Sequence, residues 1–149
     1  SDVLSLGKSS RFHTSLIKDQ KLFSEINAFI SGSFDEGLFT ISGKLLEGVS
    51  FESAEKAIIQ EIGHIKGELV TKDELTKVKN KIESTTQFSE TSVLNKAMNL
   101  SFAELIGDAN DVNLEVEHYQ KVTSEDINRV ANEILIESNC STLIYSKKK

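Results

Sequence analysis

The spacing of apolar residues changes once along the chain, near Gly48, and this change constrains the fold more than any other feature. Between residues 38 and 46 apolar and polar residues alternate, which is the two-residue period of a half-buried strand. The preceding residues 22–30 alternate less regularly, and residues 31–37 are rich in glycine and serine, so we expect a β-hairpin. After Gly48 the apolar residues follow helical spacing as far as Leu135. Strands followed by several helices predict an α+β fold, with the helices covering one face of a small antiparallel sheet.

Helix ends must be set by capping residues and glycines, because the chain contains no proline. Ser50 is placed to cap a helix, and two pairs, Thr71 with Glu74 and Thr123 with Asp126, have the spacing of capping boxes. The predicted helices cover residues 2–20 with a break near Gly7, 50–69, 71–107 with a kink near 86–90, 108–119, and 123–135. In the piece after Gly7, Phe12, Leu16 and Ile17 form the apolar face.

The last apolar run, S-T-L-I-Y at 141–145, predicts a short terminal strand. To join the hairpin, this strand must return across the helical region, so we expect residues 1–149 to form a single domain. The predicted sheet therefore consists of the hairpin plus the C-terminal strand.

Composition and charge argue against several classes of protein. The net charge of −6 disfavours a nucleic-acid partner, and the three lysines at 147–149 are interpreted as a solvated tail. No apolar run is long enough to cross a bilayer, so no membrane partner is expected. The single cysteine, Cys140, cannot form an internal disulfide and is interpreted as a packing residue. The chain begins at Ser1 with neither a methionine nor a signal peptide, which predicts a processed chain or a piece of a longer one.

The stretch L-E-V-E-H at 114–118 differs by one residue from H-x-x-E-H, the inverted zinc-protease motif. In that motif two histidines on one helix face bind zinc, and the glutamate acts as a base. Leu114 cannot coordinate a metal, and Glu115 and Glu117 are expected to point to solvent. We interpret the stretch as part of an ordinary amphipathic helix and expect neither a metal site nor catalytic residues in this chain.

Two further patterns give weaker signals. His64 has Glu61 and Glu68 at helical spacing, which could bring two carboxylates and an imidazole to a metal but more often reflects surface charge pairs. The stretch L-G-K-S-S at 6–10 is similar to the end of a phosphate-binding P-loop but lacks the earlier glycine and the preceding strand. The chemistry of the residues alone predicts no enzymatic activity.

A set of segments, each weak alone, connects the chain to a known family through their order and spacing. The first is S-D-V-L-S-L-G-K-S-S-R-F at 1–12, which is similar to the pattern L-x-x-G-x-S-S-R-L and has Phe12 at its last position. The others lie at 16–26, 34–41, 48–58, 70–81, 118–131 and 141–145. Together they resemble the pitrilysin/insulinase-type zinc metallopeptidases, or inverzincins. The resemblance spans essentially the whole chain and is to the later part of the carboxy-terminal, non-catalytic half of such enzymes.

The resemblance implies a division of labour between two halves. In this family two homologous halves close like a clamshell around a chamber, and the catalytic half carries H-x-x-E-H and its zinc. This chain is then expected to hold no cofactor, to be inactive alone and to form one wall of the chamber of a zinc metalloendopeptidase. The implied partners are the catalytic half, as part of the same chain or as a separate subunit, and peptide substrates.

The resemblance also suggests two positions for substrate contact. Family members often carry an arginine and a tyrosine in the segment L-V-R-E-x-G-L-x-Y, and these fall on Lys18 and Ser24 here. Lysine keeps the charge of arginine but loses its bidentate fork, and serine is too short to replace a phenol. These departures favour an alternative, in which the chain belongs to a catalytically dead homologue that acts as a scaffold or assembly subunit.

The resemblance has one structural implication. Family sheets contain strands that would precede Ser1, so the isolated chain is expected to leave a sheet edge unpaired. Unpaired edges tend to pair with another chain. We therefore expect a homo-oligomer formed through this edge.

Overall fold

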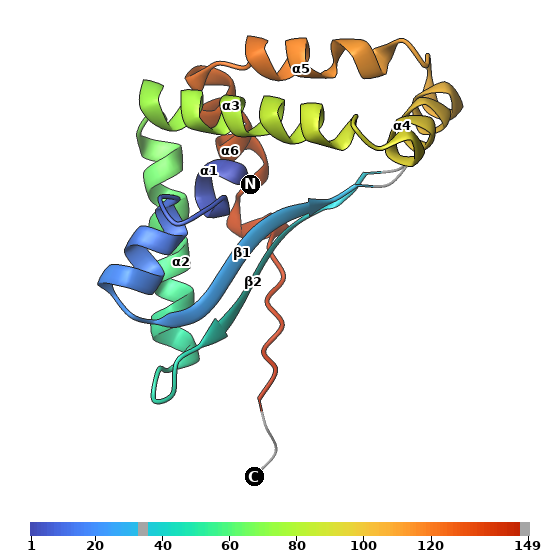
Figure 1. Ribbon diagram of the computed structural model, residues 1–149. Coiled ribbons are helices and arrows are strands. Elements are labelled where there is room, and N and C mark those ends of the chain that lie inside the picture. Colours follow the sequence, from blue (N-terminus) through green and yellow to red (C-terminus); the bar gives the residue numbers. More distant parts are fainter. Residues whose placement is uncertain (33–35, 147–149) are drawn as a thin grey trace.

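The structure is a computed structural model, in which residues 1–32 and 36–146 are described. The centre of the predicted hairpin connection and the three terminal lysines lie outside the described residues. The fold is α+β, as predicted, with a two-stranded antiparallel sheet and a larger set of helices (Figure 1). The elements in chain order are α1 (Asp2–Ser5), the π-helical segment η1 (His13–Asp19), β1 (Phe23–Ser31), β2 (Leu38–Leu45), α2 (Phe51–Gly67), α3 (Lys72–Ser89), α4 (Val93–Ile106), α5 (Asp111–Lys121), α6 (Ser124–Ile134) and the 3-10 turn η2 (Glu137–Asn139).

The hairpin contains a β-bulge that sets which side chains of β1 are buried. Phe23 pairs with Leu45 and Glu25 pairs with Lys44, so Ser24 is an extra residue in β1. An extra residue interrupts the alternation of faces. As a result Phe23 and Ile26 are both buried although they are three positions apart.

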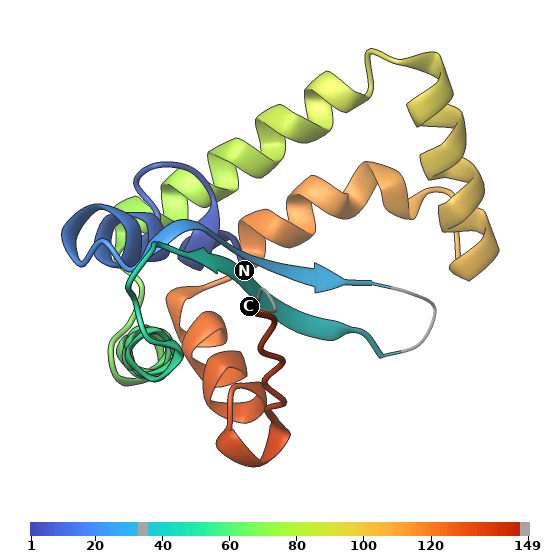
Figure 2. The ribbon, with the colours of Figure 1, turned by 90° about the horizontal axis from the view of Figure 1, so that it is seen from below.

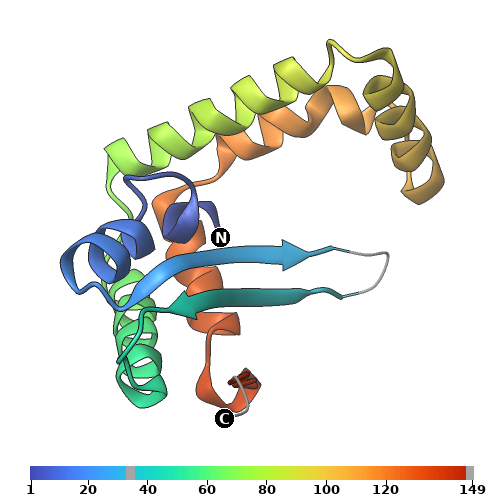
Figure 3. The same cartoon turned by 60° about the horizontal axis from the view of Figure 1, so that its bottom comes forward.

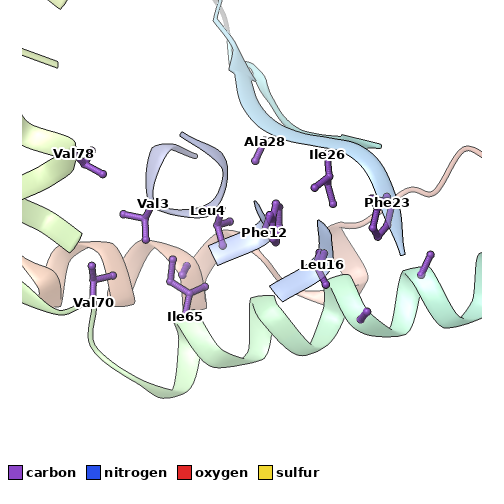
Figure 4. Packing of buried hydrophobic residues seen from close by; sticks show 13 residues of the cluster. Val3, Leu4, Phe12, Leu16, Phe23, Ile26, Ala28, Ile65, Val70 and Val78 are labelled. Atoms are coloured by element: carbon purple, nitrogen blue, oxygen red, sulfur yellow. The ribbon is translucent and has the colours of Figure 1, made fainter. Parts of the chain in front are cut away.

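The core lies between β1 and α2 and is filled mainly by α1 and η1. Phe12 and Leu16 are completely buried there, as the apolar spacing of the first segment predicts. Figure 4 shows both side chains between β1 and α2, with Leu4 of α1 beside them. The buried cluster comprises Val3, Leu4, Phe12, Leu16, Phe23, Ile26, Ala28, Ala54, Ala57, Ile65, Val70, Val78 and Ala131. The hairpin thus rests on the helices through one face of β1.

The three capping residues predicted from the sequence, Ser50, Thr71 and Thr123, are the N-caps of α2, α3 and α6. The Ser50 hydroxyl accepts a hydrogen bond from the backbone N–H of Ser53 at the start of α2. Thr71 with Glu74 and Thr123 with Asp126 form complete capping boxes at α3 and α6. Each cap satisfies backbone N–H groups that have no partner inside the helix. The kink predicted near 86–90 is a full break between α3 and α4.

The helices form two pairs. The first pair is α2 and α6, joined by a hydrogen bond of 2.9 Å from Asn128 to the carbonyl of Lys66 and one of 3.1 Å from Lys66 to the carbonyl of Leu135. The second pair is α3 and α5, which run antiparallel and extend away from the first pair as an arm (Figures 2 and 3). The helix α4 connects them at the far end of this arm.

The prediction of a C-terminal strand at 141–145 is wrong. Among the described residues the sheet contains only β1 and β2, and residues 140–146 are extended without strand pairing. After η2 the chain runs away from the body of the fold (Figure 1), and Leu143 and Tyr145 are 95% and 92% exposed. Apolar, β-branched and aromatic residues supply strand propensity, but a strand also needs a neighbouring edge for its backbone hydrogen bonds. In the described residues this segment pairs with neither strand of the hairpin, and its Thr142 hydroxyl donates to Glu55 of α2 at 3.0 Å instead.

The helix α4 ends directly before Gly107, where the predicted helix ends, but its apolar side chains lack cover. Leu94, Met98 and Leu105 follow the helical spacing seen in the sequence, yet each is more than half exposed. The α4 helix contacts mainly α5. In the part of the chain that the structure describes, no helix has both the length and the apolarity to cross a membrane.

Candidate functional site

The two positions suggested for substrate contact lie on either side of the turn that joins η1 to β1. Lys18 is in the last turn of η1 and is exposed. Ser24 is the extra residue of the β-bulge, and its hydroxyl donates to the carbonyl of Lys44 on β2 at 3.1 Å. The hydroxyl of Ser24 therefore serves the backbone of the hairpin, while Lys18 leaves its ammonium group in solvent. Their contact with a substrate stays a prediction.

A polar hollow lies where η1, α2 and α3 meet, and it opens to solvent. Its volume is about 420 Å³, and it is lined by Ser9, Ser10, Arg11, Thr14, Ser15, Glu61, His64, Glu68 and Glu74. The segment 9–11 belongs to the S-S-R pattern that carries the family resemblance.

Arg11 and Glu74 form a bidentate pair across this hollow. The Arg11 Nε and Nη2 atoms donate to the two carboxylate oxygens of Glu74 at 2.9 and 3.1 Å. This fork–fork geometry is the strongest form of an arginine–carboxylate contact. The same Glu74 side chain accepts from the backbone N–H of Thr71 at 3.0 Å and so completes the capping box of α3. The hydrogen bond from Arg11 is the largest cause that holds the pKa of Glu74 at about 2.

The second polar group of the hollow is built on Glu61, a buried carboxylate. Its Oε1 atom accepts a hydrogen bond of 2.7 Å from the hydroxyl of Ser15 and lies 3.6 Å from Nδ1 of His64. Gln20 in turn donates to the Ser15 hydroxyl at 2.9 Å. A catalytic triad needs histidine between serine and carboxylate so that the imidazole can take the serine proton. Here the carboxylate takes the central place, so the arrangement ties η1 to α2 rather than activating a nucleophile.

The residues around this hollow do not fit a zinc ion. A zinc site needs three or four nitrogen, sulfur or oxygen ligands around one point. His64 and Glu61 are adjacent and Glu68 lines the same hollow, but the described residues contain no group of three or more His, Cys, Asp or Glu side chains placed to hold a metal. The bound partners of Glu61 are Ser15 and His64 instead.

The zinc-like stretch at 114–118 lies on α5. Glu115, Glu117 and His118 are exposed, and Leu114 is half-buried at the position where the motif requires a histidine. Glu117 lies 4.0 Å from Lys121 one turn later, an ordinary surface ion pair. These positions match the interpretation of the stretch as one turn of an amphipathic helix.

Sequence reasoning did not anticipate the contact between Arg11 and Glu74. The capping box at Thr71 was readable, because its two members are three residues apart. The arginine is 63 positions away from Glu74 and lies in the helical turn that leads into η1, so no periodic signal connects the two residues. Arg11 stood out only as a member of the S-S-R pattern.

We expect Glu74→Gln to remove an acid-sensitive contribution to stability. The folded pKa of Glu74 is lowered from 4.5 to about 2, so the carboxylate stabilises the fold above pH 4.5 and loses this effect as the pH falls toward 2. The contribution is about 1–2 kcal/mol, because the pair is partly open to solvent. Glutamine retains the ability to cap α3. Urea titrations at pH 7 and pH 3 should show a larger acid-dependent loss for the unmodified chain than for the variant; equal losses would contradict the prediction.

Three solved structures are similar to this one in fold. The protease from Helicobacter pylori superposes with a TM-score of 0.86 at 22% identity, over 93% of this chain and 34% of that protein. The "putative zinc protease from Bordetella pertussis Tohama I" gives 0.79 at 22% identity, over 93% of this chain and 76% of the other. The "inactive peptidase domain of a putative zinc protease from Bordetella parapertussis" gives 0.84 at 21% identity, over 99% and 80%. At these identities the likeness establishes the fold alone.

The family follows from the sequence match. This chain spans about a third of the Helicobacter pylori protease. No curated protein sequence matches it. Residues 1–82, more than half of the chain, match the model of the family described as the peptidase M16 inactive domain. The chain therefore belongs to the peptidase M16 inactive-domain family.

Proposed function

We propose that this chain is the non-catalytic C-terminal part of a zinc metalloendopeptidase and forms one wall of a chamber that encloses peptides. The observation that carries the proposal is the match of residues 1–82 to a family of inactive peptidase domains. The fold supports it through its likeness to the inactive peptidase domain from Bordetella parapertussis. Zinc and the residues that activate water would belong to a separate catalytic half.

The contribution of such a wall would be enclosure. A chamber that closes around a peptide excludes bulk water and keeps the peptide in place for the catalytic half. The exposed Lys18 would offer a positive charge to a peptide, and the exposed Ser24 would follow it across the turn, at the start of the hairpin. The wall would raise the rate by holding the substrate, because residues 1–32 and 36–146 bring no set of zinc ligands together.

The proposal is tested by combining the chain with the separately produced zinc-binding half. We expect no peptide cleavage by the chain alone, and an increase of about tenfold or more in kcat/KM for a fluorogenic peptide when it is added to the catalytic half. The heat-unfolded chain serves as the control and should give no increase. Cleavage or stoichiometric zinc binding by the chain alone would overturn the proposal.

A scaffold subunit is the second candidate. It is favoured by the same two positions, because Lys18 lacks the fork of an arginine and the Ser24 hydroxyl is held by the carbonyl of Lys44. A chain that binds its partner half without any gain in peptide cleavage would support this reading. Folding as a single domain and self-association through the edges of the hairpin stay predictions.

A further inference from the structure

The helix α4 has the composition of a buried helix but the exposure of a surface one. Over residues 93–106 it carries only two charged side chains, Lys96 and Glu104. Its large apolar side chains face solvent: Val93 is 83% exposed, Leu94 69%, Met98 61%, Leu105 70% and Ile106 58%. Helices that are apolar around most of their circumference are normally enclosed by protein. The composition of α4 is therefore suited to a surface that another body covers.

The width of the apolar surface indicates what could cover it. At 100° per residue, the large apolar side chains from Leu100 through Val93 and Leu94 to Ile106 are spread over an arc of about 240°, in which Asn95, Ser101 and Glu104 also lie. The remaining side holds Ala103, which is buried toward the rest of the arm. One helix or strand laid against α4 would cover a stripe of about 100°. Enclosure of α4 therefore needs a concave surface, which a folded partner has and a single bound peptide lacks.

The charge around α4 favours one kind of folded partner. Residues 83–117, which we call the outer arm, contain seven carboxylates (at 83, 90, 104, 108, 111, 115 and 117) and one lysine (at 96). The outer arm thus has a net charge of −6, equal to that of the whole chain. A second copy of the chain would bring two such acidic surfaces together, which like charges oppose. A surface lined by lysine and arginine would be attracted instead.

We propose that α4 docks into a concave apolar surface with a basic rim on the catalytic half of the protease. This inference rests on the proposed function, which supplies the catalytic half as the folded partner. It adds the element that makes the contact and the chemistry of the surface that receives it. The apolar arc supplies affinity, and the carboxylates of the outer arm, such as Asp111 and Glu115, guide and orient the approach.

The inference is tested with paired substitutions on two exposed apolar surfaces. The variant Leu94→Gln/Leu105→Gln changes α4, and Ile59→Gln changes an exposed side chain of α2, which is 61% exposed. Glutamine is a good helix former and none of these side chains is buried, so circular dichroism should show folded variants. Binding to the immobilised catalytic half should weaken about tenfold or more for the α4 variant and change less than about twofold for Ile59→Gln.

The charge component has its own measurement. The variant Asp111→Asn/Glu115→Gln should slow association with the catalytic half at low salt and flatten the dependence of the association rate on ionic strength. Dissociation should change little, because rim charges act mainly on approach. An unchanged association rate at low salt would contradict the role of the outer arm.

The outcomes separate this inference from the proposed function. If the α4 variant binds the catalytic half as tightly as the unmodified chain and still raises peptide cleavage, the docking surface is wrong and the proposed function stands. If the unmodified chain neither binds the catalytic half nor raises cleavage, both are wrong. Two other outcomes would assign another occupant to α4 and overturn the inference. The first is a self-associated species, seen by sedimentation, that the α4 variant abolishes. The second is binding of a synthetic cationic amphipathic peptide that depends on α4, without binding of the catalytic half.

Discussion

Replacing Phe12 with alanine should lower the free energy of unfolding by about 3–5 kcal/mol. The ring is completely buried between β1 and α2, beside Leu4 and Leu16 (Figure 4). Removing it takes away its transfer free energy and leaves a cavity where the hairpin rests on the helices. A domain of this size has a total stability of about 5–15 kcal/mol, so the variant is expected to be partly unfolded at 37 °C. Urea denaturation followed by circular dichroism measures the loss.

The same exchange at Phe88 is the matched control. Phe88 lies near the end of α3 and is 77% exposed, so truncation should change the unfolding free energy by less than about 0.5 kcal/mol. A loss below about 1 kcal/mol for Phe12→Ala would show that the hairpin does not depend on this core.

Replacing Gly43 with alanine should cost about 1–3 kcal/mol through overpacking. A Cβ atom at this position of β2 would lie 2.8 Å from Cδ1 and Cε1 of the Phe23 ring and 3.3 Å from the carbonyl oxygen of Glu25. The ring is buried and borders the bulge, so it can move only by displacing its neighbours in the core. The thermal midpoint of unfolding should fall by several degrees.

Gly63 supplies a control of opposite sign. It lies within α2, and a Cβ atom there would have no neighbour within 4 Å. Alanine is a better helix former than glycine, so Gly63→Ala should raise the unfolding free energy by about 0.5–1 kcal/mol. If the two glycine variants shift stability in the same direction, the crowding at Phe23 is not the cause. Replacing the ring by a smaller side chain, in the double variant Gly43→Ala/Phe23→Leu, should restore part of the unfolding free energy that Gly43→Ala loses.

The local parts of this fold were predictable from the sequence because their signals lie within a few residues. The caps at Ser50, Thr71 and Thr123 are such signals, since each side chain binds backbone at most three positions away. The burial of Phe12 and Leu16 followed from apolar spacing in the same way. For these elements, propensity, capping and packing agree.

The remaining parts depend on contacts between distant residues. The segment 141–145 has strand-forming residues. Whether it pairs with a strand depends on where α6 and η2, which precede it, place it in the fold. Apolar spacing in α4 predicts a helix but not whether anything covers it. The link from Arg11 to Glu74 and the burial of Glu61 arise only when η1, α2 and α3 meet. The polar hollow was for this reason not predictable, although its residues were visible.

The anchoring of η1 has a mechanical consequence. The hydrogen bond from Ser15 to Glu61 fixes the helix that carries Lys18 to α2, whereas Ser24 is fixed to β2. Between them Lys21 adopts a left-handed φ of 52°, a backbone conformation that is uncommon for residues other than glycine. If the hairpin slides relative to α2, this joint must absorb the displacement. The distance between Lys18 and Ser24 would then change, so that this distance reports how far the hairpin has shifted relative to α2.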